Sequence, residues 1–74
     1  MNKKPEQIIA AIADHFALVN EEYEATEDAE MKLIYSITRA RIYDLLLEVV
    51  DYDEGLAEIE IEEALRRLEN SWKD

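Results

Sequence analysis

Apolar residues recur at spacings of three and four along the first third of the chain. On a helix that turns about 100° per residue they fall on one stripe, which comprises Ile8, Ile12, Phe16, Val19 and Tyr23. Pro5 suits the first helical position, because the N–H that it lacks has no helical partner there. The pattern therefore predicts a helix over residues 5–25.

A second stripe repeats at the same spacings and predicts a helix over residues 28–51. It has the form of a coiled-coil seam, made of Met31, Tyr35, Thr38, Ile42, Leu45, Val49 and Tyr52. Other apolar residues, Ile34 and Ile37 among them, lie off this seam, so apolar positions cover well over half of the helix circumference. We expect part of this excess to form an oligomer interface, made of Tyr43, Leu46, Leu47, Val50, Leu56 and Ile59.

The junctions between helices differ in clarity. Thr26 or Asp28 can cap the second helix, but no glycine or proline marks that boundary, so one continuous helix through it is an alternative. The second junction is clearer, with Asp53 as a cap and Gly55 relaxing the backbone. A third stripe over residues 55–72 contains Ala57, Ile61, Ala64, Leu65, Leu68 and Trp72.

Together these patterns predict an all-α fold. We expect a small three-helix bundle, or a helical hairpin with a third helix, that dimerises through the second helix. Residues 1–74 are expected to form a single domain, because the chain is too short for a second core.

Composition narrows the classes of protein to consider. The chain has no cysteine and one histidine, which excludes disulfides and argues against a zinc site, and no cofactor is expected. Hydrophobic residues make up 49% of the chain, which argues against disorder despite the formal net charge of −11. That charge should repel nucleic acids and anionic membranes. With a polar start and no long apolar run, we expect a cytoplasmic protein.

Two carboxylate pairs have spacings that suit a metal site. Glu21-x-x-Glu24 is followed by Glu48-x-x-Asp51, and Mg²⁺ prefers oxygen ligands. These four positions resemble the E-x-x-E and E-x-x-D pair of the all-α nucleotide pyrophosphohydrolases. The resemblance implies an oligomeric helical enzyme that uses Mg²⁺ to direct water at a nucleoside triphosphate. We prefer the alternative that these carboxylates lie on solvated helix faces, and we assign no catalytic residue.

Carboxylates also gather at both expected helix junctions. At the C-terminal end of a helix a carboxylate opposes the helix dipole, at a cost of roughly a few tenths of a kcal/mol. Stability alone therefore does not explain these residues, and we expect them to dock on a basic protein surface. The expected partner-binding residues are Glu21, Glu22, Glu24, Glu27, Asp28, Glu30, Asp51, Asp53 and Glu54.

These features predict a non-enzymatic interaction module. We expect a homodimeric regulator or inhibitor of a nucleic-acid-handling protein, of bacterial or phage type, whose carboxylates imitate the phosphates of DNA. It should bind a protein with a basic surface and make no direct contact with nucleic acid or membrane. The alternatives are the Mg²⁺-dependent hydrolase, a purely structural oligomer or scaffold subunit, and an acidic surface that serves solubility alone.

Overall fold

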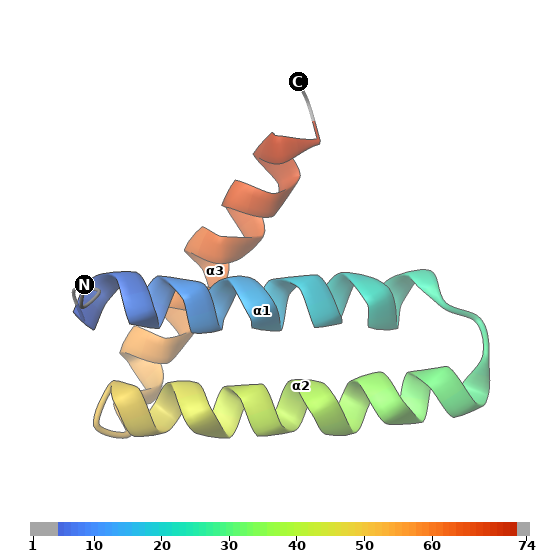
Figure 1. Ribbon diagram of the computed structural model, residues 1–74, viewed down its shortest axis with the longest axis horizontal. Coiled ribbons are helices and arrows are strands. Elements are labelled where there is room, and N and C mark those ends of the chain that lie inside the picture. Colours follow the sequence, from blue (N-terminus) through green and yellow to red (C-terminus); the bar gives the residue numbers. More distant parts are fainter. Residues whose placement is uncertain (1–4, 73–74) are drawn as a thin grey trace.

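The computed structural model describes residues 5–72, which form three helices: α1 (Pro5–Ala25), α2 (Ala29–Val49) and α3 (Glu54–Ser71). Helices α1 and α2 form an antiparallel hairpin, and α3 crosses behind α1 at a steep angle, so that its last turns project beyond the hairpin (Figure 1). The predicted all-α, three-helix class is confirmed. The alternative of one continuous helix is wrong, because α1 and α2 are separate.

Asp28 explains why the chain can turn sharply into α2. Its side chain accepts hydrogen bonds from the backbone N–H groups of Glu30 (2.9 Å) and Met31 (3.4 Å). The hydroxyl oxygen of Thr26 accepts a further bond from the N–H of Asp28 (3.2 Å). These bonds satisfy donors that the first turn of a helix leaves without partners, so the turn forms without glycine.

The turn between α2 and α3 differs from its prediction. Helix α2 ends at Val49 rather than at residue 51, because Asp51 and Tyr52 adopt left-handed backbone conformations, with φ of 55° and 61°. The N–H of Tyr52 donates back to the carbonyl of Leu47 (2.7 Å) and closes the helix end. Gly55 lies inside α3 without a positive φ, so the expectation that it relaxes this turn is wrong.

Gly55 therefore offers a simple stabilising substitution. We expect Gly55→Ala to raise the free energy of unfolding by about 0.5–1 kcal/mol, because alanine restricts the unfolded chain more than glycine does. The added Cβ would meet only the Asp53 Oδ1 atom, at an ordinary contact distance of 3.5 Å. Urea unfolding of the variant tests this. A loss of stability would show that the first turn of α3 needs the freedom of glycine.

The buried core within residues 5–72 is small. One cluster lies where α1 meets α3 and joins Ala13, Ala17 and Ala64, with Leu65 and Leu68 packed against it. The second lies between all three helices and is built on Leu46, Val50 and Ala57. Most of the fully buried side chains are alanines, which let the helix backbones approach closely. Leu46 is the largest side chain among the described residues that is fully buried.

Helix α2 buries only part of the predicted seam, since Met31, Tyr35 and Ile42 are half-buried as expected but other seam positions are not. Leu45 and Val49, both seam positions, are exposed, whereas Leu46 and Val50 are buried. The expectation that Leu46 and Val50 form an oligomer interface is therefore wrong, because this chain buries them itself. Leu47 is half-buried against the same cluster.

The aromatic residues are also distributed differently from the prediction. Tyr43, expected in the oligomer interface, instead packs in the hairpin, where its ring centroid lies 6.2 Å from that of Phe16. Tyr52 and Trp72, expected in the core, are largely exposed. Leu56 and Ile59, the remaining interface candidates on α3, are exposed and stay available to a partner.

Candidate functional site

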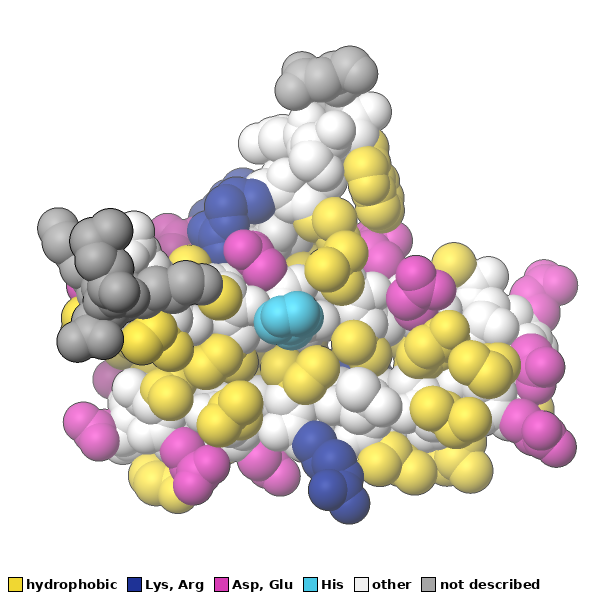
Figure 2. Space-filling view, viewed as in Figure 1, with side chains coloured by type: hydrophobic (Ala, Val, Ile, Leu, Met, Phe, Trp, Pro, Cys, Tyr) yellow, Lys and Arg dark blue, Asp and Glu magenta, His cyan; other side chains and the backbone are white. Residues whose placement is uncertain are grey.

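Six carboxylates gather where α1 turns into α2, and we term this group the acidic end. They come from the last turns of α1, the connecting loop and the first turn of α2, and comprise Glu21, Glu22, Glu24, Glu27, Asp28 and Glu30. Glu21 is half-buried and the other five are exposed. Figure 2 shows acidic side chains clustered at this end of the hairpin. The fold therefore brings six of the nine predicted partner-binding residues together.

The nearest cations do not neutralise the acidic end. Lys32 donates from Nζ to the backbone carbonyl of Tyr23 (2.8 Å), and Arg39 donates from Nη1 to Asn20 Oδ1 (2.7 Å). Both cationic groups also lie over the ring of Tyr23, at 4.2 and 4.3 Å from its centroid. Within the described range, no carboxylate of the acidic end forms an ion pair. Its negative charge is therefore directed at solvent.

The acidic end includes charges that disfavour the fold. Glu22 and Glu24 lie in the last turn of α1, which contains no basic residue to offset the negative end of the helix dipole. Asp28 and Glu30 are different, since carboxylates at the N-terminal end of α2 interact favourably with its dipole. The unfavourable pair on α1 is the part of the acidic end that helix stability does not explain.

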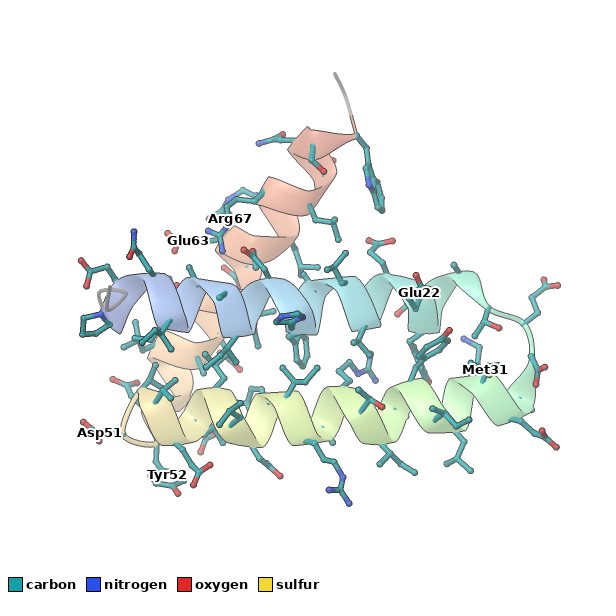
Figure 3. All side chains as sticks on the ribbon, in the orientation of Figure 1. Glu22, Met31, Asp51, Tyr52, Glu63 and Arg67 are labelled. Atoms are coloured by element: carbon teal, nitrogen blue, oxygen red, sulfur yellow. The ribbon has the colours of Figure 1, made fainter. Side chains whose placement is uncertain are left out.

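The other three predicted partner-binding residues lie elsewhere. Asp51, Asp53 and Glu54 belong to the turn between α2 and α3, and Figure 3 shows Asp51 at the opposite end of the hairpin from Glu22. Asp53 caps α3, because its carboxylate accepts a hydrogen bond from the N–H of Leu56 (3.0 Å). The nine carboxylates therefore form two surfaces rather than one.

The four-carboxylate metal site does not form within one chain. Glu21 and Glu24 lie at the acidic end, whereas Glu48 lies in the last turn of α2 and Asp51 in the turn that follows, at the other end of the hairpin. A helix of 21 residues, the length of α2, separates the two ends by about 30 Å. Among residues 5–72, no group of three or more histidine, aspartate or glutamate side chains is placed to hold a metal ion.

Part of the apolar surface of α2 is exposed in this structure. Five of its side chains are 39–63% exposed: Leu33, Ile34, Ile37, Leu45 and Val49. The off-seam positions of Ile34 and Ile37 did indicate more apolar surface than one contact could cover. The sequence pattern places Leu45 and Val49 in the inward-facing seam instead, so this surface is predictable only in part.

Two shallow hollows lie on the surface of the described residues. One, of about 240 Å³, lies between α1 and α3 and is lined by Asp14, Leu18, Ala64, Arg67 and Leu68. The other, of about 250 Å³, lies between the start of α1 and Val49 and is lined by apolar residues.

No helix in the described range combines the length and apolarity needed to cross a bilayer. A scan against protein-family models and searches of curated proteins and solved structures found no match to this chain.

Proposed function

We propose that this chain is a non-enzymatic interaction module that binds a basic surface of a nucleic-acid-handling protein through its acidic end. The observation that carries the proposal is the group of six carboxylates at one end of the hairpin, none of which forms an ion pair within the described residues. Such a patch attracts a basic partner over a distance and speeds its encounter. Since it would occupy the lysines and arginines that otherwise hold phosphates, the module would act as a regulator or inhibitor.

Solubility alone is a weaker explanation of the acidic end. Carboxylates on any exposed surface keep a protein soluble, and α3 already carries several of them, Glu58 and Glu62 included. Glu22 and Glu24 stand instead at a position where the helix dipole makes a negative charge unfavourable. A stability cost at one surface is common where that surface has a binding function.

Neutralising the acidic end should weaken partner binding and stabilise the fold. The test variant replaces three exposed carboxylates by glutamine, Glu22→Gln, Glu24→Gln and Glu27→Gln. A panel of purified DNA- and RNA-binding proteins with basic surfaces is titrated by calorimetry over a salt series. For a partner that binds, we expect affinity to fall steeply with salt and the variant to bind at least about tenfold more weakly. Its thermal midpoint should rise slightly, because α1 loses charges that oppose its dipole.

A matched variant separates this site from overall charge. It removes the same charge from exposed positions of α3 through Glu58→Gln, Glu62→Gln and Glu63→Gln. We expect it to keep most of the partner affinity. Equal weakening by both variants would mean that net charge alone drives binding, and the absence of salt-sensitive binding across the panel would refute the proposed function.

We also propose that the module forms a homodimer. The described residues enclose one large, fully buried side chain, Leu46, and most of the rest of the core is alanine. Domains of this size bury too little surface to be very stable alone, and association with another chain is a common remedy. The same observation favours a structural oligomer as a second candidate function, in which self-association is the whole role.

A further inference from the structure

We infer that the two cations beside the acidic end, Lys32 and Arg39, support the binding of a basic partner rather than oppose it. Together with Tyr23 they act as positioning residues, because they hold the last turn of α1 in the geometry that the partner meets. This inference rests on the proposed function and adds to it residues that lie behind the carboxylates. We term the four half-buried side chains involved the Tyr23 clamp: Asn20, Tyr23, Lys32 and Arg39.

The last turn of α1 needs support from outside the helix. The final carbonyl groups of a helix have no partner within it. This turn contains no basic residue, so Glu22 and Glu24 lie at the negative end of the helix dipole without a local counter-charge. The carboxylates of Glu27 and Asp28, in the loop that follows, add repulsion. Without other contacts we expect the turn to fray, which would leave its two exposed carboxylates in variable positions.

Lys32 supplies the missing support from α2. The carbonyl of Glu22 accepts a hydrogen bond from the N–H of Thr26 (3.1 Å), and the carbonyl of the next residue, Tyr23, accepts one from Lys32 Nζ (2.8 Å). A hydrogen bond from an ammonium group is stronger than one between neutral groups. The same ammonium group places a positive charge at the end of α1, where the helix dipole favours a cation.

The ring of Tyr23 joins Lys32 to the second cation. Lys32 Nζ lies 4.2 Å from the ring centroid and the guanidinium carbon of Arg39 lies 4.3 Å from it, while Arg39 Nη1 donates to Asn20 Oδ1 (2.7 Å). Lys32 and Arg39 are two helical turns apart and therefore share one side of α2. Asn20 and Tyr23, three residues apart, share one side of α1. The clamp thus forms only when the two helices lie in register.

Neutral partners keep both cations away from the carboxylates. Lys32 follows Asp28 by four residues, a spacing that allows an ion pair on a helix, yet its Nζ bonds to the Tyr23 carbonyl. Arg39 bonds to an amide, Asn20, in a chain with 19 acidic residues, and an aromatic ring attracts cations without carrying a charge. Figure 3 shows Glu22 and Met31, sequence neighbours of Tyr23 and Lys32, at the same end of the hairpin. The clamp therefore fixes the acidic end without pairing with its carboxylates.

Replacing Lys32 separates positioning from simple attraction between charges. Lys32→Gln removes a positive charge near the acidic end, so charge alone predicts tighter binding of a basic partner. We expect instead that a folded DNA-binding protein from the panel binds this variant about tenfold more weakly, and that Lys32→Arg restores most of the affinity. Arg41→Gln removes the same charge from an exposed position of α2 and should change the affinity less than about twofold.

A flexible probe provides a second control. An unstructured oligoarginine peptide can follow carboxylates in any arrangement, so it should bind Lys32→Gln at least as tightly as the wild-type chain. Equal weakening of the peptide and of the folded protein would mean that the variant has lost more than the arrangement of its carboxylates, and would overturn the positioning role.

Hydrogen exchange of the free chain tests the clamp without a partner. We expect the amides of residues 22–25 to exchange about tenfold faster in Lys32→Gln and in Tyr23→Leu than in the wild-type chain, with little change in the middle of α1. Tyr23→Phe keeps the ring that both cations contact and should exchange like the wild-type chain.

The outcomes distinguish the clamp from the proposed function. Unchanged exchange in both Lys32→Gln and Tyr23→Leu would overturn the clamp. Faster exchange with unchanged or tighter binding of the folded partner would overturn its role in positioning the acidic end. Absence of binding across the whole panel would refute the proposed function and the positioning role with it, whereas exchange in the free chain would still decide whether the clamp orders the last turn of α1.

Discussion

Replacing Leu46 by alanine should destabilise the fold by about 3 kcal/mol. Leu46 is 0% exposed and joins α2 to Val50, Ala57 and the flanking side chains of α1 and α3. Its truncation removes buried apolar surface and leaves a cavity that helix backbones already in close contact cannot readily close. Because a chain of this length has a total stability of only about 4–11 kcal/mol, much of that stability should be lost. Urea unfolding followed by circular dichroism measures the change.

The neighbouring leucine is the matched control. Leu45 is on the exposed side of α2, so Leu45→Ala should cost less than about 1 kcal/mol when measured on the monomer at high dilution. The periodicity of the sequence alone predicts the opposite order, with Leu45 in the seam and Leu46 outside it. A larger loss for Leu45→Ala than for Leu46→Ala would contradict the orientation of α2 in this fold.

The second large effect is expected from overpacking the contact between α1 and α3. Ala64 is fully buried against Ala13 and Ala17, where the absence of larger side chains lets the two helices touch. Ala64→Leu would push α3 away from α1 and should cost about 3 kcal/mol, at the upper end of the usual range for overpacking. The near-ultraviolet signal of the aromatic residues and the unfolding midpoint should both fall.

Ala40→Leu is the control for this substitution. Ala40 is exposed in the middle of α2, so the same change in side chain should alter the stability of the monomer by less than about 0.5 kcal/mol. If Ala64→Leu were tolerated as well as Ala40→Leu, α3 would not be held against α1 by close packing of small residues.

The helices themselves could be predicted from the sequence because their signals are local. Apolar spacing fixed the stripe on α1, and the caps at Asp28 and Asp53 are recognisable from residue type and position. The end of α2 was placed two residues too late. Nothing in Asp51 and Tyr52 indicates the left-handed backbone that both adopt, since neither is glycine.

The orientation of α2 could not be predicted because both of its sides mix polar and apolar residues. Lys32 and Arg39 are typical of a solvent-facing side, yet both lie on the side that faces α1. Their aliphatic stems pack in the hairpin while their charged groups reach the Tyr23 carbonyl and Asn20. Hydrophobic periodicity carries no information about such inward-facing cations, so the predicted seam departs from the buried side of α2 at Leu45 and Val49.

The sequence alone predicts that the carboxylates of the acidic end lie close together. Charge alone does not show that the second group of carboxylates, at the turn between α2 and α3, forms a separate surface. Glu22 lies in the last turn of α1 and Glu27 in the short loop that follows, so the two lie close together in any hairpin. Asp51 is separated from them by the length of α2, about 30 Å for 21 residues. Helix length, rather than charge, shows that the two groups are separate surfaces.

Self-association and the binding of a basic partner should respond to salt in opposite directions, and sedimentation velocity over a salt series tests this most directly. The chain is measured alone and with a basic partner. We predict that the dimer strengthens with salt, because screening reduces the repulsion between two chains of charge −11, and that partner binding weakens. Salt dependence of the same sign in both reactions would contradict an apolar dimer interface that is separate from an acidic partner-binding end.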